Sequence, residues 1–162
     1  MEKVNISNIE VIEELRSNLP MATISKNGLM SANFYTHGRR YTVTLSGENA
    51  GKCVCICKLV GIYKRVVINM LGIFEYNPIN IMIGISTHTG AQDAKLSIKN
   101  IVNDNRVEFY KKMVDDSFYL FARSNGASGN PCFLQLNSLG DTYSDTGVVY
   151  EYDDSYTKID IP

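Results

Sequence analysis

The sequence contains no tryptophan, two histidines and four prolines among its 162 residues. It also lacks the G-x-S-x-G, H-E-x-x-H and P-loop motifs that mark many hydrolases, zinc proteases and nucleotide-binding enzymes. Neither His37 nor His88 has an obvious nucleophile beside it in the sequence. We therefore expect a protein that is not an enzyme and that requires no cofactor.

Strong charge of one sign and long apolar runs are also missing. The formal net charge is -1 at pH 7, and the basic residues form no group larger than pairs such as Arg39-Arg40, Lys64-Arg65 and Lys111-Lys112. Nucleic-acid binding needs a larger basic surface than this. No apolar run approaches the roughly 18 residues of a membrane span, and MEKVNISNIE lacks the basic and apolar regions of a signal peptide. We expect synthesis in a cytosol, no nucleic-acid partner and no membrane insertion.

Cysteine is scarce, but three of the four cysteines alternate in the stretch KCVCICK. On a β-strand, Cys53, Cys55 and Cys57 would lie on one face, about 6.7 Å from one to the next. A tetrahedral zinc site is usually built from C-x2-C pairs, which this stretch lacks. We interpret KCVCICK as a strand covered on both faces, with all four cysteines reduced and no bound metal.

From Arg39 onward, apolar and polar residues alternate with the period of two that is typical of β-strands. Turn-forming stretches such as SGENAGK, EYNPIN and SNGASGNP separate the apolar segments. The turn Asp115-Asp116-Ser117 predicts a hairpin. The predicted strands are 41–45, 52–60, 64–75, 79–86, 94–102, 106–113, 117–123, 131–137 and 147–153. Short strands at this spacing predict an all-β fold, an antiparallel β-sandwich of the jelly-roll kind.

A helical pattern precedes the strands. Ser7-Asn8-Ile9-Glu10 has the form of a capping box, and Pro20 prevents the helix from continuing. A helix this short is marginally stable alone, so its apolar stripe needs a partner. That partner is either the body of the same chain or the same helix of neighbouring subunits. The stripe consists of Ile9, Ile12, Leu15 and Leu19.

The stretch ATISKNGLMSANFY, residues 22–35, resembles the KDGLMSA element of bacteriophage and prophage tail-fibre and appendage proteins. In that family the element precedes a distal domain and belongs to a trimeric shaft. Asn27-Gly28 suits a tight turn, and Leu29-Met30 is an apolar pair that needs burial. The match ends after Ala32, where Asn33-Phe34-Tyr35-Thr36 replaces the usual charged continuation. The remaining strand pattern is similar to the β-sandwich heads or knobs of such fibres.

The resemblance implies an N-terminal trimerising helix at 1–20, a shaft-like connector at 21–38 and a β-sandwich knob at 39–162. It implies a homotrimeric virion protein of a tail or head fibre, bound to other appendage proteins, that attaches to a glycan or protein on the bacterial surface. The alternative is a monomeric carbohydrate-binding module of a cellular protein. The expected trimer contacts are Ile9, Ile12, Leu15, Leu19, Leu29 and Met30.

Tyrosine is the residue type best suited to recognition here, because it combines a flat apolar ring with a polar hydroxyl. The chain has ten tyrosines against six phenylalanines. The tyrosines assigned to strands are expected to be structural: Tyr41, Tyr63, Tyr110, Tyr119, Tyr150 and Tyr152. The tyrosines in predicted loops or termini are candidates to face a ligand: Tyr35, Tyr76, Tyr143 and Tyr156. The candidate binding loops are 46–51, 87–93, 124–131 and 138–147. The candidate receptor-binding residues are Tyr35, Tyr76, His88, Asn125, Asn130 and Tyr143.

Two groups of acidic residues bear on metal binding and hydrolysis. Asp141, Asp145, Asp153 and Asp154 gather near the C-terminus, but they lack the spacing of a calcium loop, so we expect them to form polar turns. Glu75 and Glu108 lie on separate predicted strands and are the pair considered for glycoside hydrolysis. Any two carboxylates on separate strands would satisfy that description, so hydrolysis is not expected. A metal site is not expected either, because the spacing of a calcium loop is missing.

Overall fold

The computed structural model describes residues 39–103, 105–127, 129–140 and 144–162. The predicted helix at 1–20, the connector at 21–38 and all six expected trimer contacts lie outside these residues. The strands are β1 (Arg39–Thr44), β2 (Cys53–Val60), β3 (Arg65–Phe74), β4 (Asn77–Ser86), β5 (Lys95–Val102), β6 (Val107–Val114), β7 (Ser117–Ser124), β8 (Cys132–Gly140), β9 (Val149–Tyr150) and β10 (Thr157–Ile159). Two short 3-10 helices, η1 (Gly47–Asn49) and η2 (Ala91–Asp93), lie in loops. No helix among the described residues is long and apolar enough to cross a membrane.

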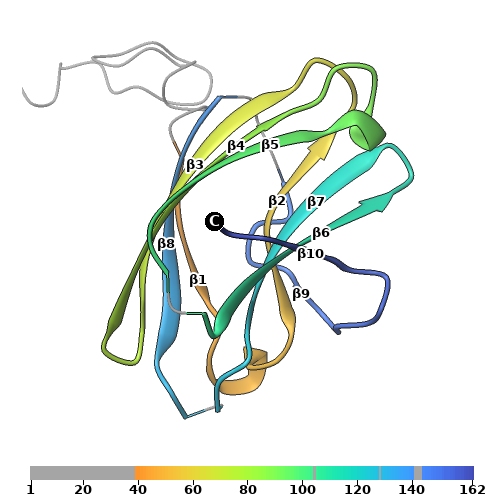
Figure 1. Cartoon of the computed structure of the whole chain (residues 1–162). Helices are drawn as coiled ribbons and strands as arrows, with labels where there is room; N and C mark the ends of the chain where they lie inside the picture. Colours follow the sequence, from red (N-terminus) through yellow and green to blue (C-terminus); the bar gives the residue numbers. More distant parts are fainter. Residues whose placement is uncertain (1–38, 104, 128, 141–143) are drawn as a thin grey trace, which may run out of the picture. The chain divides into compact units, whose positions relative to one another are not determined.

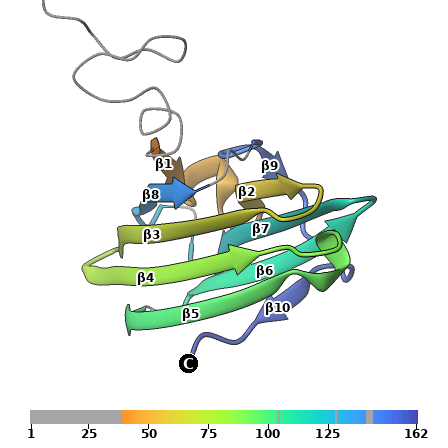
Figure 2. The same ribbon diagram turned by 90° about the horizontal axis from the view of Figure 1, so that it is seen from above.

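The predicted antiparallel β-sandwich is confirmed. The first sheet has the strand order β1-β8-β3-β4-β5, and the second has the order β10-β6-β7-β2-β9. Strand β1 pairs with β8 and β2 pairs with β7, two pairings that a jelly roll also has. Strands β3, β4 and β5 differ from that pattern, because they are neighbours in sequence order in the first sheet. The two sheets face each other (Figure 1). Strands β5 and β10 form the edges on one side of the sandwich, and β1 and β9 those on the other (Figure 2).

The period-two pattern located the strands because each strand buries alternate side chains between the sheets. In β3, Val66, Ile68 and Met70 are buried, whereas Val67 and Leu71 are exposed. The predicted hairpin is also confirmed, since Val114 pairs with Ser117 across the turn. The inner faces of the two sheets therefore form one apolar core.

The C-terminal strand was predicted too long. Of residues 147–153 only Val149–Tyr150 is a strand, and β10 was not predicted. The reason is a turn at Asp153, whose side chain accepts hydrogen bonds from the backbone N–H and the hydroxyl of Ser155. Aspartate and serine stabilise such turns by bonding to nearby backbone groups. This turn interrupts the strand and lets the chain continue into β10.

The three alternate cysteines of β2 are fully buried, as expected, but they do not share one face. Cys55 lies opposite Phe121 of β7, whereas Cys57 lies opposite Leu120, so two steps along β2 correspond to one step along β7. This is a β-bulge, and it shifts the alternation of side chains by one residue. The prediction of a common face for the three thiols is therefore wrong.

The bulge assigns the thiols to two separate clusters. Cys57 packs in the core between the sheets, whereas Cys53 and Cys55 pack against aromatic side chains on the outer face of the second sheet. All four cysteines are buried, and none of them forms a disulfide. Burial raises the pKa of Cys53 to about 11 and that of Cys55 to about 12. These thiols are therefore protonated at neutral pH and serve as apolar packing groups.

Candidate functional site

Three of the sequence-predicted site residues lie at one end of the sandwich. Tyr76 occupies the turn between β3 and β4 and is 94% exposed, while Asn125 and Asn130 belong to the loop between β7 and β8. Arg106 connects these segments, because it forms an ion pair with Glu75 at 3.2 Å and its carbonyl oxygen accepts a hydrogen bond from the Asn125 N–H at 2.9 Å. These contacts hold the two segments together at this end of the sandwich. Of the three predicted site residues here, Tyr76 is the one that presents an exposed aromatic ring.

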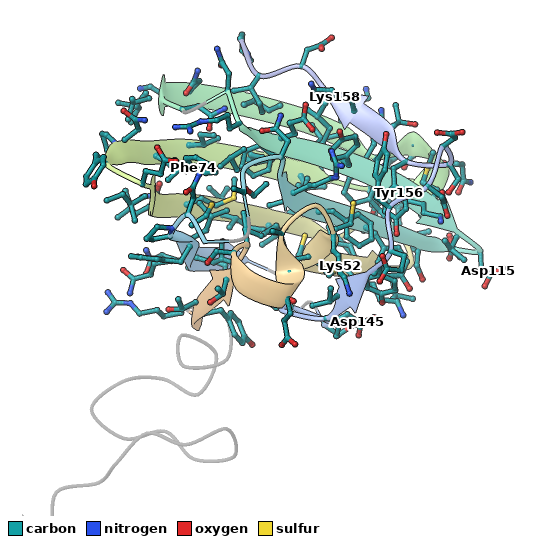
Figure 3. The ribbon with its side chains drawn as sticks, turned by 90° about the horizontal axis from the view of Figure 1, so that it is seen from below. Lys52, Phe74, Asp115, Asp145, Tyr156 and Lys158 are labelled. Carbon is teal, nitrogen blue, oxygen red and sulfur yellow. The ribbon has the colours of Figure 1, made fainter. Side chains whose placement is uncertain are left out.

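His88 lies at the opposite end of the sandwich, in the loop after β4. Figure 3 shows the separation of the two ends, with Phe74 of β3 at one and Asp115 of the β6–β7 turn at the other. The His88 ring packs edge-on against Tyr63, with ring centroids 4.9 Å apart. Asp93 orders this loop by accepting the backbone N–H groups of His88 and the next residue at 2.9 and 2.6 Å. The structure therefore separates His88 from Tyr76, Asn125 and Asn130, which lie at the other end of the sandwich. Two further candidates lie outside the described residues: Tyr35 and Tyr143.

Aromatic side chains gather instead on the outer face of the second sheet. On β7, Tyr119 and Phe121 are two residues apart and lie side by side, with ring centroids 5.7 Å apart and planes within 5°. Tyr150 packs edge-on against both rings, and Tyr156 packs edge-on against Phe121 at 5.0 Å. We call the full set the aromatic face; it consists of Tyr110, Tyr119, Phe121, Tyr150, Tyr152 and Tyr156.

The aromatic face contains a small hollow of about 150 Å³. Tyr119 and Phe121 line it from β7, while Tyr150 and Tyr156 line it from the C-terminal segment. Lys112 and Val114 of β6 complete the lining, and we call this site the aromatic hollow. Flat aromatic surfaces with nearby polar groups suit ligands that are apolar on one side and polar on the other.

A larger hollow of about 470 Å³ lies on the outer face of the first sheet. It is lined by small and aliphatic residues of β3, β4, β5 and β8, such as Val67, Gly84 and Leu139. No aromatic side chain lines it, and its charged residues are Arg65 and Lys95. Because it offers few groups that would orient a ligand, we consider the aromatic hollow the better candidate site.

Two lysines flank the aromatic hollow. Tyr119 lies opposite Lys58 of β2 on one side and opposite Lys112 of β6 on the other. The Lys58 ammonium is 5.1 Å from the centroid of the Tyr119 ring, and the Lys112 ammonium is 4.4 Å from that of Tyr156. Hydrogen bonds to Tyr119 and Asp145 raise the pKa of Lys58, so its ammonium is charged at neutral pH. Phe121 is 1% exposed and Tyr156 is 7% exposed, so Tyr119 and Tyr150 are the rings of the hollow that a ligand can reach. The hollow therefore combines these two rings with nearby cations.

The C-terminal acidic residues form separate ion pairs with these lysines. Asp145 lies 3.3 Å from the Lys58 ammonium, and Asp153 lies 3.7 Å from that of Lys112. Within the described residues, no group of three or more histidine, cysteine, aspartate or glutamate side chains is placed to hold a metal ion. The aspartates thus act in turns and ion pairs; one of them, Asp141, lies outside the described residues.

Glu108 anchors a charged network beside the aromatic hollow. Its carboxylate accepts hydrogen bonds from the Tyr110 hydroxyl at 2.8 Å, from Arg123 at 3.2 Å and from Lys158 at 2.6 Å. Burial alone would raise the pKa of Glu108, but the hydrogen bonds from Lys158 and Tyr110 and the two positive charges lower it. Glu75 is held separately by its ion pair on the other sheet. Both carboxylates considered for hydrolysis are therefore engaged in ion pairs.

Tyr119 and Tyr150 were expected to be structural, and they pack against the buried aromatic cluster while also lining the hollow. Tyr156, a candidate to face a ligand, also lines the hollow, although it is only 7% exposed. Tyr63 lies in the turn after β2 rather than in a strand, and it is 63% exposed. Tyr119, Phe121 and Arg123 are alternate residues of β7, so their side chains point to the same face of the sheet. This alternation was the signal in the sequence for an aromatic outer face.

No protein-family model and no curated protein matches this sequence. One solved structure that matches is the tailspike protein gp49 from Acinetobacter baumannii bacteriophage Fri1, a capsular polysaccharide depolymerase. The match has 11% sequence identity and a TM-score of 0.40, and it covers 91% of this chain. This chain spans 23% of the length of that protein. With a TM-score this low, the comparison assigns neither a family nor a function.

Proposed function

We propose that this protein is the distal part of a phage tail or head fibre, a non-enzymatic homotrimer that attaches the virion to a glycan on the bacterial surface. The observation that carries the binding function is the aromatic hollow, with Lys58 and Lys112 beside it. The assignment to a phage rests on the resemblance of residues 22–35 to the fibre shaft element. A protein receptor is the other possibility within the same function.

The aromatic hollow has the properties that glycan binding requires. A sugar ring has an apolar face of C–H groups that packs on an aromatic ring, while its hydroxyls bond to polar groups around it. Tyr119 and Phe121 project from the same strand, so the sheet holds their rings in place before a ligand binds. A hollow of this size binds one sugar weakly, and three copies in a trimer would increase the avidity for a repeating polymer.

Adhesion fits the described carboxylates better than hydrolysis does. A glycosidase needs one carboxylic acid with a raised pKa, so that it stays protonated and donates to the leaving group. The pKa of Glu108 is lowered instead, because the carboxylate accepts hydrogen bonds from cationic side chains. Glu75 is paired with Arg106. These are the two carboxylates that the sequence suggested for catalysis.

Replacing Tyr119 by alanine is expected to weaken binding to bacterial surface polysaccharides at least tenfold, because a stacking ring in a binding site carries a large share of the affinity. The measurement is surface plasmon resonance on polysaccharides immobilised from a panel of bacterial strains. Tyr76→Ala is the matched control, because it removes a fully exposed ring at the end of the sandwich. A loss with Tyr76→Ala and none with Tyr119→Ala would move the site to the loops, and no binding by the unmodified protein would contradict the glycan function.

The aromatic hollow would serve equally in a monomeric carbohydrate-binding module, which is the second candidate. The molar mass in solution, measured by light scattering, separates the two. The fibre proposal predicts three times the 18.1 kDa of one chain. A mass of one chain would favour the module, because the predicted helix at 1–20 would then have no neighbouring subunit to pack against.

A further inference from the structure

The cations beside the aromatic hollow form a row across the second sheet. Lys58, Tyr119 and Lys112 are directly opposite one another on β2, β7 and β6. Neighbouring strands lie about 4.8 Å apart, so the backbone positions of the two lysines are separated by about 10 Å, with the tyrosine between them. The next row towards the strand ends contains Val60 and Val114, which are 53% and 42% exposed. A ligand stacked on Tyr119 would therefore lie between two ammonium groups.

Lys112 keeps more of its hydrogen-bonding capacity available than Lys58, whose ammonium already donates to Tyr119 and Asp145. An ammonium group has three donors, and the Lys112–Asp153 separation of 3.7 Å is long for a hydrogen bond. Asp153 already accepts two hydrogen bonds from Ser155. Ion pairs at a protein surface contribute little energy, so a ligand carboxylate can join or replace the aspartate at little cost.

The charged side chains in and beside the hollow determine which ligand charge binds there most favourably. The lining includes one cationic side chain, Lys112, and no carboxylate. A positively charged ligand would find aromatic rings there, but it would have to compete with Lys58 and Lys112 for Asp145 and Asp153. A neutral sugar would gain stacking but would bring no counter-charge to the two ammonium groups. A carboxylate bound near the rings would gain charge-assisted hydrogen bonds as well as stacking.

We infer that the aromatic hollow selects an acidic saccharide, whose ring stacks on Tyr119 and whose carboxylate contacts Lys58 or Lys112. This inference rests on the proposed function, since it names the ligand class of the same hollow. It predicts that the charge of the sugar, and not only its shape, determines which surface polymers the protein binds. It also predicts that binding weakens as the salt concentration rises.

The test compares two ligands that differ only at one carbon, methyl β-D-glucuronide and methyl β-D-glucoside. Each is titrated into the full chain at 20 mM and 500 mM NaCl, and binding is followed through the NMR signals of Tyr119 and Phe121. The acid is expected to bind at least tenfold more tightly at low salt, and most of this preference should disappear at high salt. Lys58→Gln and Lys112→Gln are made separately, and at least one of them should lower the preference at least threefold; no change in either would overturn the inference. Lys99→Gln, an exposed lysine on β5 of the other sheet, is the matched control and should leave the preference unchanged.

The outcomes separate this inference from the function on which it rests. Equal affinity for the two glycosides, tighter binding of methyl β-D-glucosaminide, or no shift of the Tyr119 and Phe121 signals would each overturn the acidic specificity. If polysaccharide binding that depends on Tyr119 persists in any of these cases, the proposed function stands. If the unmodified protein binds no surface polysaccharide, the proposed function fails, and a preference for the glucuronide in the titration would still support the acidic site.

Discussion

Replacing Gly72 by alanine is expected to destabilise the protein by about 3 kcal/mol or more, because an added methyl group would meet backbone that cannot move away. Gly72 is in the central strand β3, paired with Leu134 of β8 and Ile79 of β4. A Cβ atom there would overlap the carbonyl oxygen of Phe133 and would lie 2.7 Å from a methyl group of Leu134. Both neighbouring strands are held by the sheet, so the clash requires a local rearrangement of the first sheet.

Gly84→Ala is the matched control, because this glycine is in β4 of the same sheet but has space beside it. Its added Cβ would lie 3.8 Å from the nearest atoms, those of Ser97, which is ordinary van der Waals contact. We expect Gly84→Ala to change the free energy of unfolding by less than about 1 kcal/mol, since alanine also loses less backbone entropy than glycine. Urea unfolding followed by circular dichroism measures both variants. Equal stability of the two would mean that β3 and β8 are not this close.

Replacing Glu108 by glutamine is expected to destabilise the protein by about 2 kcal/mol at pH 7, because hydrogen bonds to charged groups are lost and two cations keep no counter-charge. The Glu108 side chain is 13% exposed, and it accepts hydrogen bonds from Tyr110, Arg123 and Lys158. Glu151→Gln is the matched control, because that side chain is 81% exposed in its ion pair with a lysine. The control should change stability by less than about 0.5 kcal/mol.

The contribution of Glu108 is also expected to depend on pH. Its folded-state pKa is lowered from the usual 4.5, so the carboxylate stabilises the fold above pH 4.5 and loses this effect as the pH falls through the folded pKa. The stability difference between the native protein and Glu108→Gln should therefore be full at pH 7 and shrink at pH 3. Urea unfolding at both pH values measures it. A difference that stays constant with pH would mean that the glutamate charge does not stabilise the fold.

Local patterns in the sequence predicted the strands well. Alternation of apolar and polar residues is a property of each strand alone, so β1 to β8 were found within a few residues of their bounds. The bulge between Cys55 and Cys57 could not be predicted from this alternation, because a bulge depends on how β2 pairs with β7. The same reasoning also misjudged residues 147–153, where the turn at Asp153 outweighs the strand pattern.

The candidate site was harder to predict than the fold. Loop residues such as Tyr76 and His88 were selected as polar and exposed, but the sheet topology places them at opposite ends of the sandwich. The aromatic hollow joins Tyr119 of β7 to Tyr150 and Tyr156 of the C-terminal segment, which are 31 and 37 residues further along the sequence. No local pattern relates residues so far apart.

By itself, the sequence determined the all-β class, the strand positions and the reduced state expected of the cysteines, because these follow from composition and from the alternation of side chains. Only the tertiary structure decided which faces of the sheets point outward, and therefore which aromatic rings and lysines meet. The physical reason is that strand pairing and register are set by contacts between distant segments. A shift of one residue, such as the bulge in β2, moves every later side chain of that strand to the other face of the sheet.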